Sequence, residues 1–133
     1  MNRLKELFPY MADINLDKPT DRMESAKKEF EGVGIFPERM SGVSIHGTDN
    51  PMVNGMMGCT LSHLKILLEA KKRNQNVLIF EDDVKFINDY ENIIDNACGQ
   101  LYERDWFLFY LGANILKPFH NVSDNLARLN HAQ

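Results

Sequence analysis

The sequence predicts an α/β fold, a mostly parallel sheet with helices on both faces. Short apolar runs alternate with segments whose apolar residues recur at helical spacing, in the order strand, helix, strand, loop, helix, strand, helix, strand. That alternation is typical of parallel strands joined by crossover helices. The clearest run is residues 77–80, Val-Leu-Ile-Phe, a short apolar segment of the kind expected for a strand buried on both faces.

Three further strands are expected from weaker patterns. Residues 11–16 alternate roughly between apolar and polar, although Asp13 needs a partner if it is buried there. Residues 40–45 suggest a second strand of lower apolar content. Residues 106–111, Trp-Phe-Leu-Phe-Tyr-Leu, have the composition of a buried strand, which Gly112 would end.

Helical spacing predicts the connections between these strands. The first helix is expected to begin at Asp21, an N-cap whose capping box Glu24 completes, and to end at Gly32 and Gly34. Its apolar stripe comprises Met23, Ala26, Phe30 and Val33. The last helix is expected to begin after Asn88 or Asp89 and to present Tyr90, Ile93, Ile94, Ala97 and Leu101 as its apolar face.

The middle helix is expected over residues 60–73, with Leu61, Leu64, Leu67 and Leu68 as its buried stripe. Residues 46–58, just before it, contain the turn-forming pairs Asn50-Pro51 and Asn54-Gly55 and are expected to form a loop. Three methionines in that loop, Met52, Met56 and Met57, suit a mobile wall of a cleft.

Composition indicates one globular domain. The chain has 133 residues, of which 44% are hydrophobic, and its net charge of -4 argues against a nucleic-acid partner. No apolar run approaches the roughly 20 residues of a membrane span, and the N-terminus lacks a secretory signal, so we expect no transmembrane segment and a cytoplasmic location. Cys59 and Cys98 are accordingly expected to be free thiols.

The strongest functional signal is the acidic triplet Glu81-Asp82-Asp83, which follows the central strand directly. In open α/β sheets, ligands bind at the carboxyl ends of the strands. Adjacent carboxylates repel one another unless a cation compensates them, and Mg²⁺ or Mn²⁺ prefers such oxygen ligands. If the backbone stays extended, Glu81 and Asp83 point the same way. The alternative is a solvated acidic turn.

Two weaker candidate sites accompany the triplet. Asn15, Leu16, Asp17 and Arg22 lie at the carboxyl end of the first strand, where backbone groups can pair with a nucleobase and Arg22 can contact phosphate. From spacing alone, a surface cap with a solvated arginine is favoured there.

The second candidate is residues 58–63, Gly-Cys-Thr-Leu-Ser-His. Cys59 and His63 lie four residues apart on one helical face, but two ligands do not make a zinc site, and a Cys59 nucleophile with a His63 base lacks a motif. A helix N-terminus that presents Ser62 and His63 to a ligand is favoured over both, while a packed histidine stays equally open.

Taken together, these segments resemble glycosyltransferase family 25, the lipopolysaccharide-type glycosyltransferases whose relatives include procollagen galactosyltransferases. The segments that carry the resemblance are residues 14–17 with Asp21-Arg22, Phe30 and Gly34, residues 58–63, residues 77–84 and residues 106–112. Each is weak alone, but their order and spacing are fairly specific.

The resemblance implies a GT-A-like (Rossmann-like) fold and the donor-nucleotide-binding part of such an enzyme over residues 1–133. It further implies a UDP-sugar donor, typically UDP-galactose, and inversion at the anomeric carbon. The acceptor would be a saccharide or lipid-linked saccharide in lipopolysaccharide or glycan biosynthesis. A divalent ion, Mn²⁺ or Mg²⁺, would be held by Asp83 first and Glu81 second. The expected donor-binding residues are Asn15, Leu16, Asp17, Arg22, Ser62, His63, Glu81 and Asp82.

Two departures from the family pattern matter. Asp13 stands where relatives usually carry an apolar residue. The chain ends at Gln133, where relatives continue with another strand and the acceptor-side half, so the general base is expected outside it. A homo-oligomer and a peripheral association with the inner membrane remain open.

Two other functional classes compete with the transferase interpretation. One is a non-catalytic nucleotide-sugar-binding module. The other is a receiver-like signalling domain, which residues 78–83 also resemble. The 50 residues after Asp83 are too few for the remaining elements of a receiver.

Overall fold

The computed structural model describes residues 2–18 and 20–129, which form two compact units. One unit comprises the described part of residues 8–86, and the other combines residues 2–7 with residues 87–129. The expectation of a single domain stays a prediction. None of the described helices is long and apolar enough to cross a membrane.

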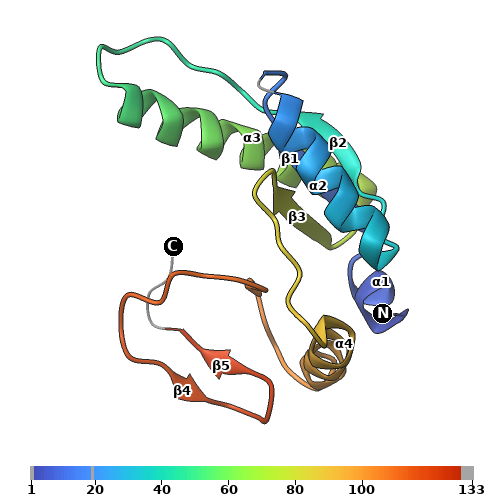
Figure 1. Cartoon of the computed structure of the whole chain (residues 1–133). Helices are drawn as coiled ribbons and strands as arrows, with labels where there is room; N and C mark the ends of the chain where they lie inside the picture. The colour runs from blue at the N-terminus through green and yellow to red at the C-terminus, as the bar shows by residue number, and fades with distance from the viewer. Residues whose placement is uncertain (1, 19, 130–133) are drawn as a thin grey trace. The chain divides into compact units, whose positions relative to one another are not determined.

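A three-stranded parallel sheet forms the centre of the unit at residues 8–86 (Figure 1). Its strands are β1 (Tyr10–Asn15), β2 (Glu38–Ser41) and β3 (Val77–Glu81), in the order β2-β1-β3. The register pairs Asn15 with Ser41 and Ile14 with Glu81, so the carboxyl ends of all three strands meet at one edge. The chain passes from β1 to β2 and then crosses to the other side of β1, which makes the position between β1 and β3 a topological switch point. The predicted α/β class and parallel sheet are confirmed.

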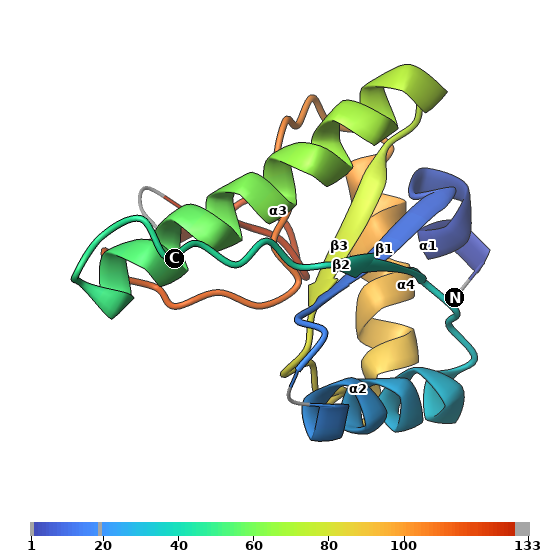
Figure 2. The ribbon, with the colours of Figure 1, turned by 90° about the horizontal axis from the view of Figure 1, so that it is seen from above.

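Helices cover both faces of this sheet, as expected (Figure 2). On one face, Ile66 and Ala70 of α3 (Pro51–Arg73) pack against Tyr10 and Ala12 of β1. On the other face lies α2 (Thr20–Val33), whose Phe30 ring meets the Phe80 ring edge-on, with centroids 5.0 Å apart.

The ends of α2 differ in how well the sequence predicted them. Gly34 ends the helix with a φ of +67°, and the Ile35 N–H donates to the Phe30 carbonyl across the C-terminus. Gly32, however, lies inside the helix. Asp21 lies in the first helical turn instead of at the cap position.

Helix α3 begins nine residues earlier than expected, so the predicted loop over residues 46–58 is wrong beyond Asn50. Asn50 is the N-cap: its side-chain oxygen accepts from the N–H groups of Met52 and Val53, and Pro51 occupies the first turn. An Asn-Pro pair is compatible with a turn and equally with the start of a helix, because asparagine is a good N-cap and proline is well tolerated in the first helical turn. The three methionines therefore lie on a helix and not in a mobile loop.

The buried face of α3 is also not the predicted one. Gly58, Ser62, Ile66 and Ala70 are buried, whereas the leucine stripe Leu61, Leu64, Leu67 and Leu68 is 38–52% exposed. Three of these four residues, Gly58, Ser62 and Ala70, are small, which allows the helix to approach the sheet more closely than a leucine face does. The helix thus carries two stripes, and the less hydrophobic one faces the sheet.

The other unit contains α1 (Asn2–Leu7), α4 (Tyr90–Leu101) and a small antiparallel pair, β4 (His120–Asn121) with β5 (Ala127–Arg128). Asp89 is the N-cap of α4, as expected, but forms no side-chain cap hydrogen bond. The buried residues of α4 are Ile94, Ala97, Cys98 and Leu101.

The strand expected over residues 106–111 is absent from the described structure, and the Phe107 side chain is fully exposed. Strand composition alone does not make a strand, because its backbone groups need a neighbouring strand to pair with.

Candidate functional site

A pocket of about 460 Å³ opens at the carboxyl edge of the sheet, inside the unit at residues 8–86. Three strand ends contribute to it: Leu16 follows β1, residues 42–46 follow β2, and Glu81 with Asp82 ends β3. Its position coincides with the switch point between β1 and β3, where open α/β sheets bind ligands. Its volume falls within the range of small-molecule sites.

One side of the first half of α3 forms the opposite wall. Its lining residues recur every three or four positions: Pro51, Asn54, Gly55, Gly58, Cys59, Ser62 and His63. Most are small or polar, so backbone and hydrogen-bonding groups lie close to the pocket. Pro51, Asn54 and Gly55 are not evident as site residues from the sequence, because their turn-forming types conceal the helical period.

Gly58 is required where α3 meets the loop after β2. A Cβ atom there would lie 2.3 Å from the carbonyl oxygen of Val43, far inside contact distance. One turn later, the buried Ser62 hydroxyl accepts a 2.8 Å hydrogen bond from the Val43 N–H and donates to the Gly58 carbonyl. These contacts fix the backbone of the pocket wall, so Ser62 has a structural role as well as a place in the lining.

The acidic triplet does not continue the strand. The Val84 N–H donates to the Glu81 carbonyl over 3.1 Å, so the chain turns after Glu81 and the expected alternation is lost. Glu81 and Asp82 line the pocket, whereas Asp83 is exposed and lies outside the lining. Arg22 also lines the pocket, with its Nη1 3.3 Å from Asp82 Oδ1. The pocket therefore holds two carboxylates and one guanidinium.

Asn15 and Asp17 lie outside the pocket lining. Asp17 is an exposed residue that accepts hydrogen bonds from Arg39 and Ser41, which lower its pKa and join the turn after β1 to β2. Asn15 is 1% exposed, and neither polar atom of its side chain meets the geometric criteria for a hydrogen bond with another described residue. The nearby Asp13 carboxyl is also buried; burial raises its pKa, and the negative charge of Asp82 adds to that effect.

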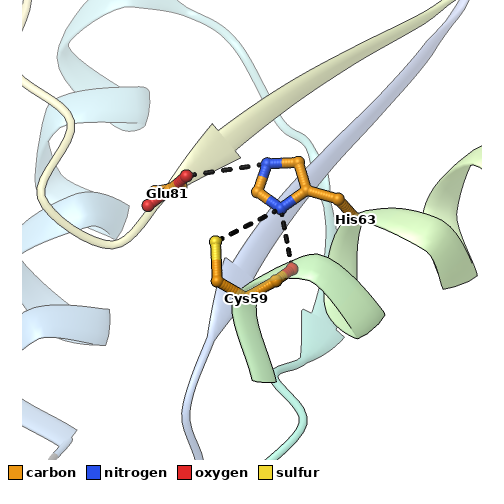
Figure 3. Close-up of side chains that lie close together, drawn as sticks. All are labelled: Cys59, His63 and Glu81. Carbon is orange, nitrogen blue, oxygen red and sulfur yellow. Dashed lines mark hydrogen bonds and ion pairs between the residues drawn. The ribbon is translucent and has the colours of Figure 1, made fainter. Parts of the chain in front are cut away.

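The side chains of Cys59, His63 and Glu81 point toward one another at the carboxyl end of β3 (Figure 3). His63 Nδ1 lies 3.0 Å from the Cys59 carbonyl oxygen and 3.7 Å from Cys59 Sγ. His63 Nε2 lies 3.6 Å from Glu81 Oε1. Burial, and then the charge of Glu81, raises the pKa of the Cys59 thiol, which argues against a nucleophilic cysteine. His63 lies far from the N-terminus of α3, so the expected presentation at a helix N-terminus is wrong.

The nine predicted site residues thus divide into two groups. The structure brings together Leu16, Arg22, Ser62, His63, Glu81 and Asp82 around one pocket. Asn15, Asp17 and Asp83 lie beside it but do not line it.

Comparison with known proteins identifies the family. The family described as glycosyltransferase family 25 (LPS biosynthesis protein) matches residues 38–131, well over half of the chain. The chain belongs to glycosyltransferase family 25. This confirms the resemblance and removes the basis for a receiver-like domain.

The curated relatives of this family 25 chain are much longer than it is. Procollagen galactosyltransferase 1-A of Xenopus laevis is 39% identical over 61% of the chain and 13% of the relative. Procollagen galactosyltransferase 2 of Homo sapiens is 25% identical over 82% of the chain and 18% of the relative. A glycosyltransferase 25 family member of Drosophila melanogaster is 26% identical over 90% and 24%. The chain therefore spans less than a quarter of each of these relatives, and no solved structure matches it significantly.

The carboxylate oxygens that line the pocket of this family 25 chain are suitable ligands for a hard divalent ion. Mg²⁺ is usually bound by one or two carboxylates together with substrate phosphates and water. Glu81 and Asp82 supply two carboxylates on the same pocket wall. Such an ion, when bound, would offset their negative charge and that of a diphosphate.

Proposed function

We propose that this chain binds the nucleotide-sugar donor of a family 25 glycosyltransferase. In the reaction, a sugar is transferred from a UDP-sugar to a hydroxyl of a saccharide or lipid-linked acceptor, with inversion and with the help of Mn²⁺ or Mg²⁺. Galactose is the sugar that the names of two of the relatives support, since these two are procollagen galactosyltransferases. The lipopolysaccharide context and the cytoplasmic location stay part of this proposal.

The observation that carries the proposal is the charge pattern of the pocket at the switch point. Two carboxylates, Glu81 and Asp82, and one guanidinium, Arg22, line the same pocket. A diphosphate needs cationic partners, and a divalent ion on the carboxylates together with Arg22 would supply them. The nucleoside would then lie near Leu16, along the wall that residues 42–46 form at the end of β2.

The proposed roles of individual residues follow from this arrangement. Glu81 would hold a divalent ion, which when bound would supply positive charge to the leaving diphosphate, and Asp82 orients Arg22 through its 3.3 Å ion pair. Asp83, the residue expected first as a metal ligand, would reach the ion only after the turn at Glu81–Val84 rearranges. Ser62 supports the wall, and His63 lies within reach of the Glu81 carboxylate.

Calorimetry with UDP, with and without Mn²⁺, tests donor binding. We expect binding that Mn²⁺ strengthens, and a loss of the Mn²⁺ effect in Glu81→Gln. Glu24→Gln is the matched control, because Glu24 is an exposed carboxylate on α2 outside the pocket. A folded wild-type chain that binds UDP no better with Mn²⁺ than without it would contradict the proposal.

Sugar transfer is tested separately, with UDP-galactose and a range of saccharide acceptors. Turnover by this chain alone would exclude a non-catalytic binding module. UDP binding without turnover would favour that second candidate while leaving the donor pocket intact.

A further inference from the structure

The side chains of Cys59, His63 and Glu81 bring together three different metal-binding atoms: sulfur, nitrogen and oxygen. One ligand atom from each residue lies within 4.8 Å of the other two. All three residues line the pocket, and Cys59 and Glu81 are exposed while His63 is half-buried. An ion can therefore reach them from solvent.

The tautomer of His63 favours coordination through Nε2. Nδ1 lies 3.0 Å from the Cys59 carbonyl oxygen, which can only accept a hydrogen bond, so the tautomer with the proton on Nδ1 satisfies this contact. The Nε2 lone pair then faces Glu81 Oε1 at 3.6 Å. Metal-bound histidines usually donate their other ring N–H to a carbonyl or carboxylate, which fixes the ring and raises its basicity. The backbone of Cys59 supplies that partner.

The spacing suits a tetrahedral ion. From the usual bond lengths of Zn²⁺, ligand atoms in a tetrahedral site lie about 3.4–3.6 Å apart. The Nε2–Oε1 separation already has this value. The remaining adjustment falls on Cys59 Sγ, which moves by rotation about a single bond on an exposed side chain.

The donor types distinguish this ion from the hard ion of the proposed function. Thiolate and imidazole favour borderline and soft cations, whereas Mg²⁺ and Mn²⁺ prefer oxygen. We propose that Cys59, His63 and Glu81 form a three-ligand site for a borderline divalent cation such as Zn²⁺, with its fourth position open to the pocket. On binding, the thiol proton passes to solvent and the thiolate sulfur bonds to the ion.

A regulatory consequence rests on the proposed function. Glu81 is shared, so an ion on the Cys59–His63–Glu81 site withdraws it from the hard ion beside Asp82. Zn²⁺ should therefore weaken Mn²⁺-assisted UDP binding in the wild type but not in Cys59→Ser. The site itself is tested without UDP, so the two proposals fail separately.

The test is a titration of the reduced, full 133-residue chain with Co²⁺ alone, followed by absorption spectroscopy. We expect one equivalent to bind with tetrahedral d–d bands and a thiolate-to-cobalt charge-transfer band, and Zn²⁺ to displace it. Cys59→Ser should abolish the charge-transfer band. His63→Asn and Glu81→Gln should each weaken binding at least about 10-fold, the lower limit seen for changes around bound metals.

Three matched variants serve as controls: Cys98→Ala, His120→Asn and Glu24→Gln, each folded by circular dichroism. They should bind Co²⁺ as the wild type does. A folded wild type without a thiolate band, a band that persists in Cys59→Ser, or an equal loss in the control variants would overturn the proposal.

Discussion

Gly58→Ala is the most direct test of how α3 forms the pocket. The added methyl group would lie 2.3 Å from the Val43 carbonyl oxygen, so helix and loop must separate by about 1 Å. Overpacking of this kind costs about 1–3 kcal/mol. The separation also stretches the Ser62–Val43 hydrogen bond, worth about 0.5–1.5 kcal/mol. Against this, alanine gains about 1 kcal/mol in helix propensity over glycine.

The net expectation is a loss of about 0.5–3.5 kcal/mol in the free energy of unfolding. Urea unfolding followed by far-ultraviolet circular dichroism measures it. Gly55→Ala is the matched control on the same helix, because a Cβ atom there meets nothing within 4 Å. That variant should gain up to about 1 kcal/mol from propensity alone. Equal stabilisation of both variants would refute the close approach at Val43.

Three further predictions test the fold by stability measurements. Ser62→Ala should cost about 1–3 kcal/mol, because the Val43 N–H loses its partner; a urea midpoint equal to that of the wild type would contradict this. Asp13 has a pKa raised in the folded state, so the wild type loses stability as pH rises above the unfolded carboxyl pKa. The side chain of Asp13→Asn does not titrate. The melting temperature of this variant minus that of the wild type should therefore be larger at pH 7 than at pH 4, and an equal difference at both pH values would contradict this. Ile66→Ala should cost about 2–5 kcal/mol in urea unfolding and Leu67→Ala much less, the reverse of the ranking that the leucine stripe predicts.

Local sequence patterns were sufficient to predict β3 and the buried face of α2. The Val-Leu-Ile-Phe run forms β3 as predicted, although only Leu78 and Phe80 are buried and Val77 and Ile79 are half-buried, and α2 buries the Ala26 and Phe30 that its period predicts. Because parallel strands end at one edge, the order of elements was enough to place Arg22 and Glu81 near each other. These conclusions need periodicity and connection rules, and no knowledge of individual contacts.

The start of α3 was not predictable from the same local rules. Asn50-Pro51, Gly55 and Gly58 each favour a turn when considered alone. What makes them helical is a cap on Met52 and Val53 and a close contact of Gly58 with Val43, both of which depend on the folded chain. The period of small residues from Pro51 to His63 was the available signal, and it appears only when glycine is counted as a contact residue.

The Cys59–His63–Glu81 cluster shows the same limit for a site. The sequence shows that Cys59 and His63 are four residues apart, and from those two ligands a zinc site was disfavoured. The third ligand comes from the end of β3, 18 residues after His63, and reaches the cluster only because α3 packs across β1 and β3. The spacing of Cys59, His63 and Glu81 along the chain does not predict that Glu81 lies near the other two residues. The register of β3 with β1 places Glu81 at that edge of the sheet.

Exposed apolar segments show what a hydrophobic pattern does and does not specify. The leucine stripe of α3 and residues 106–111 are both expected from the sequence to be buried, yet Leu67 is 52% exposed and Phe107 is fully exposed. A hydrophobic pattern indicates that burying an apolar face is favourable, by about 25 cal/mol for each Å² removed from water. It does not indicate which element will cover that face. Inside residues 8–86 the competition for the sheet is decided by distance of approach, and Gly58, Ser62 and Ala70 bring α3 closer than leucines would. The geometry that buries the smaller stripe is also what brings Cys59 and His63 to the end of β3, so packing and site share one cause.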